Sequence, residues 1–330
     1  MLVKELLTDS ALTHATVFPL QNVSIPGLTN YHTIRKIVFD SIKDPSPPLY
    51  SGPMETLKWI AYQKWDGIRK NTTNFECPHC EEDVARLSYD SEVGNCPNCN
   101  GSLYLTDWFG FHQVMAPDSA PDSVGTDYMN IHETLLLFTG IRLFWENKRD
   151  ILPECLFIKD GSLAIRAQYS KLVNPLRNFL QYAKNSGYNV NILGQEKSGR
   201  FFDHLELIGP DAPSEHIFIP GDPYIKQEIQ QRPNTGAPYG KDTNYGAKVF
   251  VKYNEYHKMI LNFPTGRYIP NAKYSDLIGA DNIFATLPTL LSYRHEGALL
   301  PIELAHGIAS LSTYPSAHIL TIFAGARATL

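Results

Sequence analysis

Four of the five cysteines form two C-x-x-C pairs, Cys77 with Cys80 and Cys96 with Cys99. In a C-P-x-C turn both thiolates point at one centre, and two such turns complete a tetrahedral four-thiolate zinc site, which is closed and therefore structural. A redox-active C-x-x-C is the competing interpretation, but redox motifs rarely occur as a matched pair. The spacing therefore predicts a zinc ribbon.

Three acidic residues stand where predicted strands or helices could aim them at a common point. Asp107 ends the strand-like run SLYLTD, and Asp160 ends CLFIKD. The carboxyl end of a buried strand faces the crevice where α/β sheets bind ligands. Glu133 lies early in a predicted long helix, 128–147, on its apolar stripe, so the helix either buries it or points it into a cleft.

Two aspartates and a glutamate converging on one point would suit Mg²⁺ or Mn²⁺, which prefer oxygen ligands. One or two such ions could activate a water and stabilise a leaving oxygen. Structural alternatives stay open: Asp160-Gly161 is a common turn pair, Asp107 could cap a turn, and Glu133 could complement a helix dipole. His306, on the inner face of a predicted helix, is more often a core residue than a catalytic one.

Hydrophobic periodicity predicts strands alternating with helices, which favours an α/β sheet. The region 210–243 is rich in loops and receives no assignment. Prolines make 43–53 an extended connector. The expected helices are 33–42, 54–70, 128–147, 172–184 and 299–311, and the expected strands are 101–111, 155–158, 188–194, 247–254 and 258–264.

The composition is that of an ordinary globular protein, with 43% hydrophobic and 19% charged residues and a net charge of −5. Such a chain is not a polycation, so any binding of DNA needs a local basic groove or metal ions. We see no signal peptide and no run of ~18 apolar residues, so we expect a cytoplasmic protein without a membrane span. Cys155 is expected to be a buried apolar residue.

An ordered set of short motifs resembles the NurA family of DNA-repair nucleases, specifically bacterial members that carry a zinc ribbon. LFIKDGSLAI is similar to the family's DGxL strand, and the set spans 77–311 in the family's order. The motifs are CPNCNGSLYLTDWFGFH, HETLLLFTGIR, LFIKDGSLAI, ILGQEKSG, TNYGAKVFVKYN and LLPIELAHGIASL.

The resemblance implies a ribonuclease-H-like mixed sheet flanked by helices, together with the zinc ribbon. It implies a deoxyribonuclease that depends on Mn²⁺ or Mg²⁺, with 5′ end resection exonuclease and single-strand endonuclease activity, in DNA repair or anti-phage defence. Family members work on DNA as dimers beside a hexameric HerA-type ATPase that translocates DNA. DNA, such an ATPase and a second copy of the chain are therefore the expected partners.

The resemblance also assigns residues by position. Asp107 matches the family's first aspartate, Glu133 the helix glutamate, Asp160 the second aspartate and His306 the histidine of the terminal helix. These are the expected catalytic residues, and the three carboxylates are the expected Mn²⁺ or Mg²⁺ ligands. Lys197 matches the lysine in ILGQEKSG and is an expected phosphate contact, with a solvated loop lysine as the alternative.

The chain departs from the family in three places. Many relatives have Asp-Gly-Ser where this chain has Asp107-Trp108-Phe109, and a Tyr-Pro pair where it has Leu300-Pro301. Glu146 lies nearer to Asp160 in sequence than Glu133 does and remains the alternative helix ligand. We prefer Glu133 because Glu146 falls at the solvated end of the helix.

These expectations divide the chain into an N-terminal helical and extended region (1–70), the zinc ribbon (71–106) and a nuclease domain (107–330). The alternative function is a non-catalytic zinc-ribbon module that docks onto an ATPase or nucleic acid, with structural carboxylates. A zinc-ribbon protein of transcription or RNA handling would show clustered basic and aromatic residues, and no such run occurs. The apolar run 319–326 could be a docking surface or a core helix.

Overall fold

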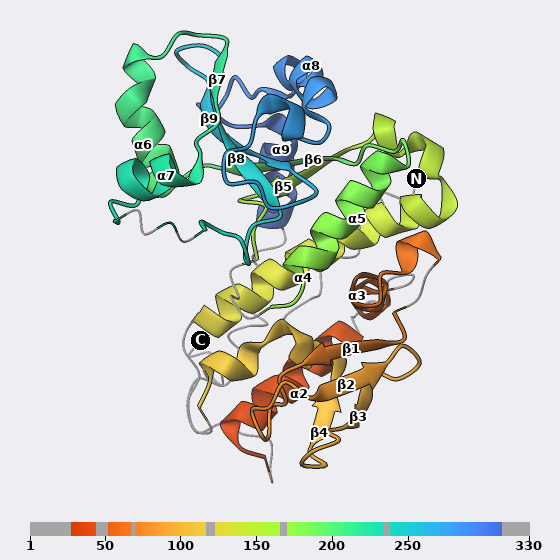
Figure 1. Ribbon diagram of the computed structural model, residues 1–330. Helices are drawn as coiled ribbons and strands as arrows, with labels where there is room; N and C mark the ends of the chain where they lie inside the picture. Colours follow the sequence, from red (N-terminus) through yellow and green to blue (C-terminus); the bar gives the residue numbers. More distant parts are fainter. Residues whose placement is uncertain are drawn as a thin grey trace, which may run out of the picture.

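A five-stranded mixed sheet organises one half of the molecule in this computed structural model (Figure 1). The structure describes residues 28–43, 52–67, 70–116, 123–165, 170–233, 236 and 238–311. The sheet's strands are β5 (Leu156–Asp160), β6 (Asn191–Glu196), β7 (His216–Phe218), β8 (Gly246–Lys252) and β9 (Lys258–Pro264). Their order is β5-β6-β9-β8-β7; β5 and β6 are parallel and the other neighbours antiparallel. The chain is therefore a mixed α/β protein, as the alternation of patterns predicts.

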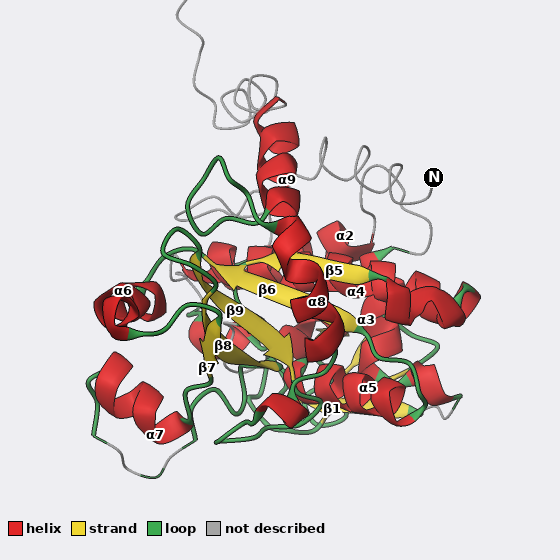
Figure 2. Cartoon of the chain, turned by 90° about the horizontal axis from the view of Figure 1, so that it is seen from above, coloured by secondary structure: helices red, strands yellow, loops and turns green. Residues whose placement is uncertain are grey.

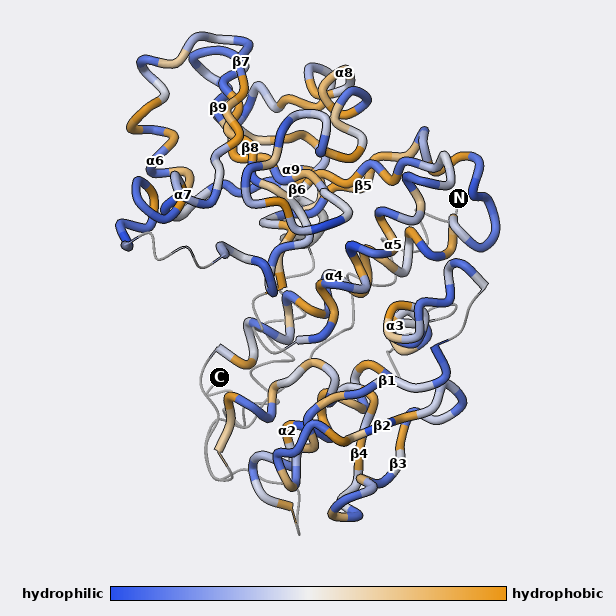
Figure 3. Tube along the Cα trace, in the orientation of Figure 1, coloured by the Kyte–Doolittle hydropathy of each residue, from blue (hydrophilic) through white to orange (hydrophobic). Residues whose placement is uncertain are grey.

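Helices cover both faces of this sheet. Alternate side chains of β6 show the division, because Ile192 packs with α4 (Ser123–Asn147) and α5 (Val173–Asn185), whereas Leu193 packs with α8 (Ala280–Leu290) and α9 (Leu300–Leu311). In Figure 2, α8 and α9 lie over one face, and α9 crosses β5. α6 (Arg200–Ile208) covers β8 and β9 on the α4 side. Strands β8 and β9 are among the most hydrophobic stretches of the chain (Figure 3), as burial on both faces requires.

The N-terminal half consists of two helices and a pair of small hairpins. Its elements are α2 (Asn30–Lys43), α3 (Pro53–Ala61), and the antiparallel hairpins β1 (Thr72–Phe75) with β2 (Ala85–Ser88) and β3 (Val93–Asn95) with β4 (Ser102–Tyr104). Apolar side chains of the hairpins, such as Leu87 and Leu103, share one core with α4 and α5. These two long helices lie between the hairpins and the sheet (Figure 1).

The chain makes a tight crossing immediately after β5. Gly161 has a φ of 100°, which favours glycine, and its amide donates to the carbonyl of Gln195 at 2.7 Å. The segment then crosses Gly194, where a Cβ atom would lie 2.7 Å from the Gly161 carbonyl oxygen. Leu163 is buried beyond the crossing and its carbonyl accepts from Tyr245 at 2.9 Å. The D-G-x-L pattern thus ends the strand and leaves Asp160 at the sheet's rim.

Most of the expected elements are confirmed, and two are wrong in extent. The helix predicted to run to residue 70 ends at Ala61, because Gln63 adopts a left-handed conformation with a φ of 52°. The predicted strand 101–111 stops at Tyr104 and continues as the 3₁₀ helix Leu105–Phe109. The unassigned region 210–243 contains β7, α7 (Asp222–Tyr224) and the single π turn Ile225–Ile229.

Part of the predicted proline connector, 44–51, and the apolar run 319–326 lie outside the described residues. None of the helices in the described part of the chain combines the length and the apolar character that crossing a bilayer requires.

Candidate functional site

The four paired cysteines converge at the tips of the two hairpins. Their sulfur atoms all lie within 4.8 Å of one another. Cys77 Sγ is 3.7 Å from Cys99 Sγ, and Cys80 Sγ is 3.9 Å from Cys96 Sγ. A tetrahedral zinc with ~2.3 Å bonds to sulfur requires sulfur–sulfur edges of ~3.8 Å. The site therefore fits a structural metal ion such as zinc, as the spacing predicts.

Asp107 belongs to the same half of the molecule and not to the large sheet. Arg35 of α2 donates to both of its carboxylate oxygens, Nε to Oδ1 and Nη2 to Oδ2, each at 2.8 Å, and the Tyr104 amide donates to Oδ2 at 2.8 Å. The pair is almost fully buried. Burial disfavours the charged guanidinium, but the bond to Asp107 outweighs it and raises the pKa of Arg35.

The expectation that Asp107 ends a strand of the catalytic sheet is therefore wrong. It caps the 3₁₀ helix that follows β4, which is the turn-capping alternative that its sequence left open. Within the described ranges, the four cysteines are the only group of three or more potential metal ligands that lie close together. Asp107 therefore does not form a cluster with Glu133 and Asp160.

Asp160 meets two other predicted residues instead. Its Oδ2 lies 2.6 Å from His306 Nε2 of α9, and its Oδ1 lies 3.3 Å from Lys197 Nζ, just after β6. All three side chains are partly exposed, with Asp160 at 46%. Three segments far apart in the sequence therefore bring a carboxylate, an imidazole and an ammonium group to one rim of the sheet.

Glu133 lies near this rim but on the other face. Its Oε2 is 3.2 Å from Lys159 Nζ, and its side chain is half exposed, so the helix points it outward to the rim of the sheet. Lys159 and Asp160 are consecutive residues of β5, so their side chains point to opposite faces. Lys159 faces α4 and Asp160 faces α9. The pleat of β5 therefore separates the two carboxylates that the sequence predicts to act together. The alternative Glu146 pairs with Arg142 of its own helix at 3.3 Å.

Sequence reasoning misses a row of four residues on the α4 side of the sheet, three of which have polar side chains. Lys159, Gly194, Asn262 and Lys248 are successive cross-strand neighbours, and both lysines are buried. Lys248 bonds to Glu196, which also accepts from Asn262 at 2.9 Å. Burial lowers the pKa of Lys248 against the opposing effect of Glu196. A lysine inside an apolar strand run, as in LFIKD and KVFVK, is the signal that could have revealed this row.

The donor set at Asp160 allows a test of the predicted Mn²⁺ or Mg²⁺. A carboxylate and an imidazole in direct contact, both open to solvent, fit one divalent ion that accepts a nitrogen ligand. An imidazole ligand suits transition-metal ions better than Mg²⁺, which prefers oxygen ligands. The donor pair does not reproduce a site with three carboxylates, because Asp107 lies in the other half of the molecule and Glu133 on the other face.

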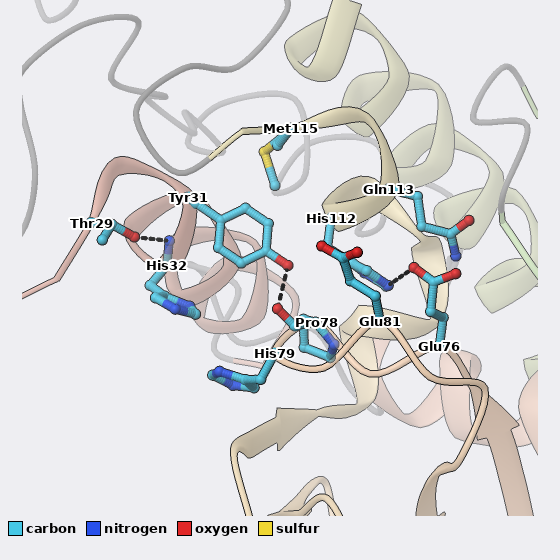
Figure 4. A pocket seen from close by; sticks show the side chains of 10 residues that line it. All are labelled: Thr29, Tyr31, His32, Glu76, Pro78, His79, Glu81, His112, Gln113 and Met115. Carbon is cyan, nitrogen blue, oxygen red and sulfur yellow. Dashed lines mark hydrogen bonds and ion pairs between the residues drawn. The ribbon is translucent and has the colours of Figure 1, made fainter. Parts of the chain in front are cut away.

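A separate cavity of about 580 Å³ is lined in part by Pro78 and His79, the two residues between Cys77 and Cys80 in the sequence (Figure 4). Its polar lining includes Glu76, Glu81 and His112, with His112 Nε2 3.5 Å from Glu76 Oε1. His112 is buried, and burial lowers its pKa to about 4. The imidazole is therefore neutral at pH 7.

No protein-family model, curated protein or solved structure matches this chain.

Proposed function

We propose that the chain is a metal-dependent deoxyribonuclease of the NurA kind whose reaction centre is the rim formed by Asp160, Lys197 and His306. The observation that carries the proposal is the contact of Asp160 with both His306 and Lys197. The family resemblance assigns a role to each of these three residues. The mixed sheet with helices on both faces is compatible with the ribonuclease-H-like core that the resemblance implies.

The three side chains have complementary tasks in phosphodiester hydrolysis. The Asp160 carboxylate, at the exposed end of β5, would hold a divalent cation. Lys197 would bind a non-bridging phosphate oxygen, since its ammonium group already lies against a carboxylate oxygen. His306, on the open side of α9, would bind the same cation through Nε2, the atom that now contacts Asp160. Glu133 would assist from the other face through Lys159.

A bound Mn²⁺ would supply Lewis-acid chemistry, lowering the pKa of a coordinated water and polarising the phosphoryl oxygens. Asp160 and His306 are the residues that would hold it, in place of their present hydrogen bond. Lys197 would then be released from Asp160 and become available to the phosphate.

The partners follow from the same resemblance. We propose that a HerA-type ATPase delivers DNA to this rim and that two copies of the chain act together. A net charge of −5 suits this arrangement, because delivery by a translocating ring lowers the requirement for intrinsic affinity for DNA.

The test is digestion of end-labelled linear single- and double-stranded DNA by the purified protein with Mn²⁺, Mg²⁺ or EDTA, with and without a HerA-type ATPase. Asp160→Asn is the critical variant. Asp40→Asn is its matched control, because Asp40 is a similarly exposed aspartate that pairs with a lysine, Lys36, on α2.

We expect cleavage that requires Mn²⁺ and falls at least 100-fold in Asp160→Asn, with the Asp40→Asn variant at the wild-type rate and zinc content unchanged in both. Equal rates in wild type and Asp160→Asn, or no cleavage under any condition while the ATPase still binds, would refute the nuclease. The second result would identify a docking module with structural carboxylates.

A further inference from the structure

The loop between α8 and α9, residues 292–298, exposes an aromatic ring and a cation. Tyr293 is 76% exposed, and the side chains of Arg294 and His295 are 81% and 60% exposed. Exposed tyrosine and arginine side chains are among the groups that proteins use to stack unpaired bases and to hold phosphates.

The backbone of this loop is held in place at both ends. At its start, the Ser292 carbonyl oxygen lies 2.9 Å from His257 Nε2, and the Ser292 hydroxyl donates to Glu303 of α9 at 2.5 Å. At its end, Gln195 Nε2 donates to the Gly297 carbonyl oxygen at 2.5 Å. The exposed side chains therefore project from a pre-organised turn, which lowers the entropic cost of binding.

The orientation of the Tyr293 ring is also restrained. It meets the His257 ring edge to face, with centroids 5.2 Å apart and planes at 84°. With this ring contact and a side chain that is largely exposed, Tyr293 keeps ring surface available for a planar partner.

The same anchors bring the loop to the Asp160 rim. Gln195 is the register partner of Asp160 on β6, and in parallel strands such partners point to the same face. Arg294 Nη1 is 3.7 Å from Glu303 Oε1, and Glu303 precedes His306 by one turn of α9, about 5 Å along the helix. The buried Oε1 atom of Gln195 has no hydrogen-bond partner, so this amide is a further polar group beneath the loop.

We infer that Tyr293 and Arg294 form a platform for single-stranded DNA next to the Asp160 rim, with an unpaired base stacked on Tyr293 and a phosphate held by Arg294. This inference rests on the proposed function, because it assigns to the same rim the means of selecting unpaired nucleotides. In duplex DNA the bases are stacked on one another and cannot stack on the Tyr293 ring.

The test is the binding of a fluorescein-labelled oligodeoxythymidylate and of a labelled blunt duplex, measured by anisotropy without added Mn²⁺ or Mg²⁺, so that cleavage plays no part and the zinc site stays loaded. Tyr293→Ala should weaken binding of the single strand about tenfold, and Tyr293→Phe should change it less than twofold. Arg294→Ala should reduce the magnitude of the slope of log K against log salt concentration by about 0.7, the value for one single-strand phosphate contact. Tyr274→Ala, at an exposed tyrosine of the 3₁₀ helix Tyr274–Asp276, is the control.

The platform would be overturned if the protein did not bind the single strand, or if Tyr293→Ala bound it as tightly as the wild type does. It would also be overturned if Tyr293→Ala weakened binding of the blunt duplex to the same extent. The proposed nuclease fails by a different result, since a protein that never cuts DNA can still bind it through Tyr293. Conversely, if cleavage requires Asp160 but binding of the single strand does not depend on Tyr293, the proposed nuclease stands and the platform is refuted.

Discussion

His306 Nε2 lies 2.6 Å from Asp160 Oδ2, although 146 residues separate them in the chain. The contact joins the last residue of the edge strand β5 to the helix that crosses it. Because both side chains are open to solvent, the pair contributes little to stability. Its position at the rim of the sheet, beside Lys197, is the observation on which the proposed catalytic role rests.

The pleat of β5 predicts that the carboxylates of Asp160 and Glu133 contribute unequally to cleavage. Asp160→Asn should reduce Mn²⁺-dependent cleavage at least 100-fold, whereas Glu133→Gln should reduce it less than tenfold, because Glu133 pairs with Lys159 on the opposite face of β5. Initial rates on labelled DNA measure both. Equal losses would show that Lys159 moves aside and that the two faces combine at the strand end.

Asp107→Asn should reduce stability and leave the chemistry of the rim untouched. The substitution leaves the buried Arg35 guanidinium without its anion, at a cost of about 3–5 kcal/mol in the free energy of unfolding. Urea denaturation measures the loss, with Asp40→Asn, at an exposed ion pair, as the control that should lose less than about 0.5 kcal/mol. The paired replacement Arg35→Met with Asp107→Leu should recover part of the loss. A direct role for Asp107 in metal binding would instead abolish cleavage in a fully stable protein.

His112 should make stability depend on pH. Burial lowers its pKa to about 4 from an ordinary 6.5, so the folded state binds the proton less readily than the unfolded state. Its contribution is complete above pH 6.5 and is lost as the pH falls toward 4, by up to about 3 kcal/mol. Denaturation curves of wild type and His112→Leu between pH 7 and pH 4.5 test this. The cysteine site responds to acid in both proteins, so the difference between the two slopes isolates His112. Identical slopes would contradict the prediction.

Metal content should follow the four cysteines that converge. The protein should contain one zinc per chain, and Cys80→Ser should lose it and melt about 5 °C lower or more. Elemental analysis and thermal denaturation provide the two readouts. Cys155→Ser should keep both the zinc and the melting temperature, because Cys155 lies outside the cluster. If the wild-type protein without zinc were as stable as the wild-type protein with zinc, a structural metal would be excluded.

The crossing after β5 predicts that Gly194→Ala costs about 1–3 kcal/mol, because the new Cβ atom would meet the Gly161 carbonyl oxygen at 2.7 Å. The matched control is Gly140→Ala in α4, where the nearest atom would be 3.8 Å away and helix propensity favours alanine. If both variants are equally stable, the backbone after Asp160 relaxes more easily than the close contact implies.

The sequence predicts those features that depend on local pattern. The cysteine spacing predicts the four-cysteine cluster, and apolar alternation predicts β6, β8 and β9, because both signals lie within a few residues. Asp107 is misplaced because SLYLTD has the same pattern whether it ends a sheet strand or a hairpin. Only its long-range partner Arg35, contributed by α2, decides between the two. Likewise, the ion pair between Lys159 and Glu133 joins two different elements, β5 and α4. A short window of sequence around Lys159 does not contain Glu133, so local pattern cannot predict the pair.

Because side chains alternate between the two faces along β5, the face that Asp160 occupies depends on whether the number of residues before it in the strand is odd or even. Inserting or deleting one residue between Cys155 and Asp160 would exchange the two sides of the strand, presenting the lysine to α9 and the aspartate to α4. A change of two residues would restore the assignment. In any related chain, the number of residues between the start of this strand and its aspartate is therefore a simple indicator of whether the histidine of the last helix can reach a carboxylate.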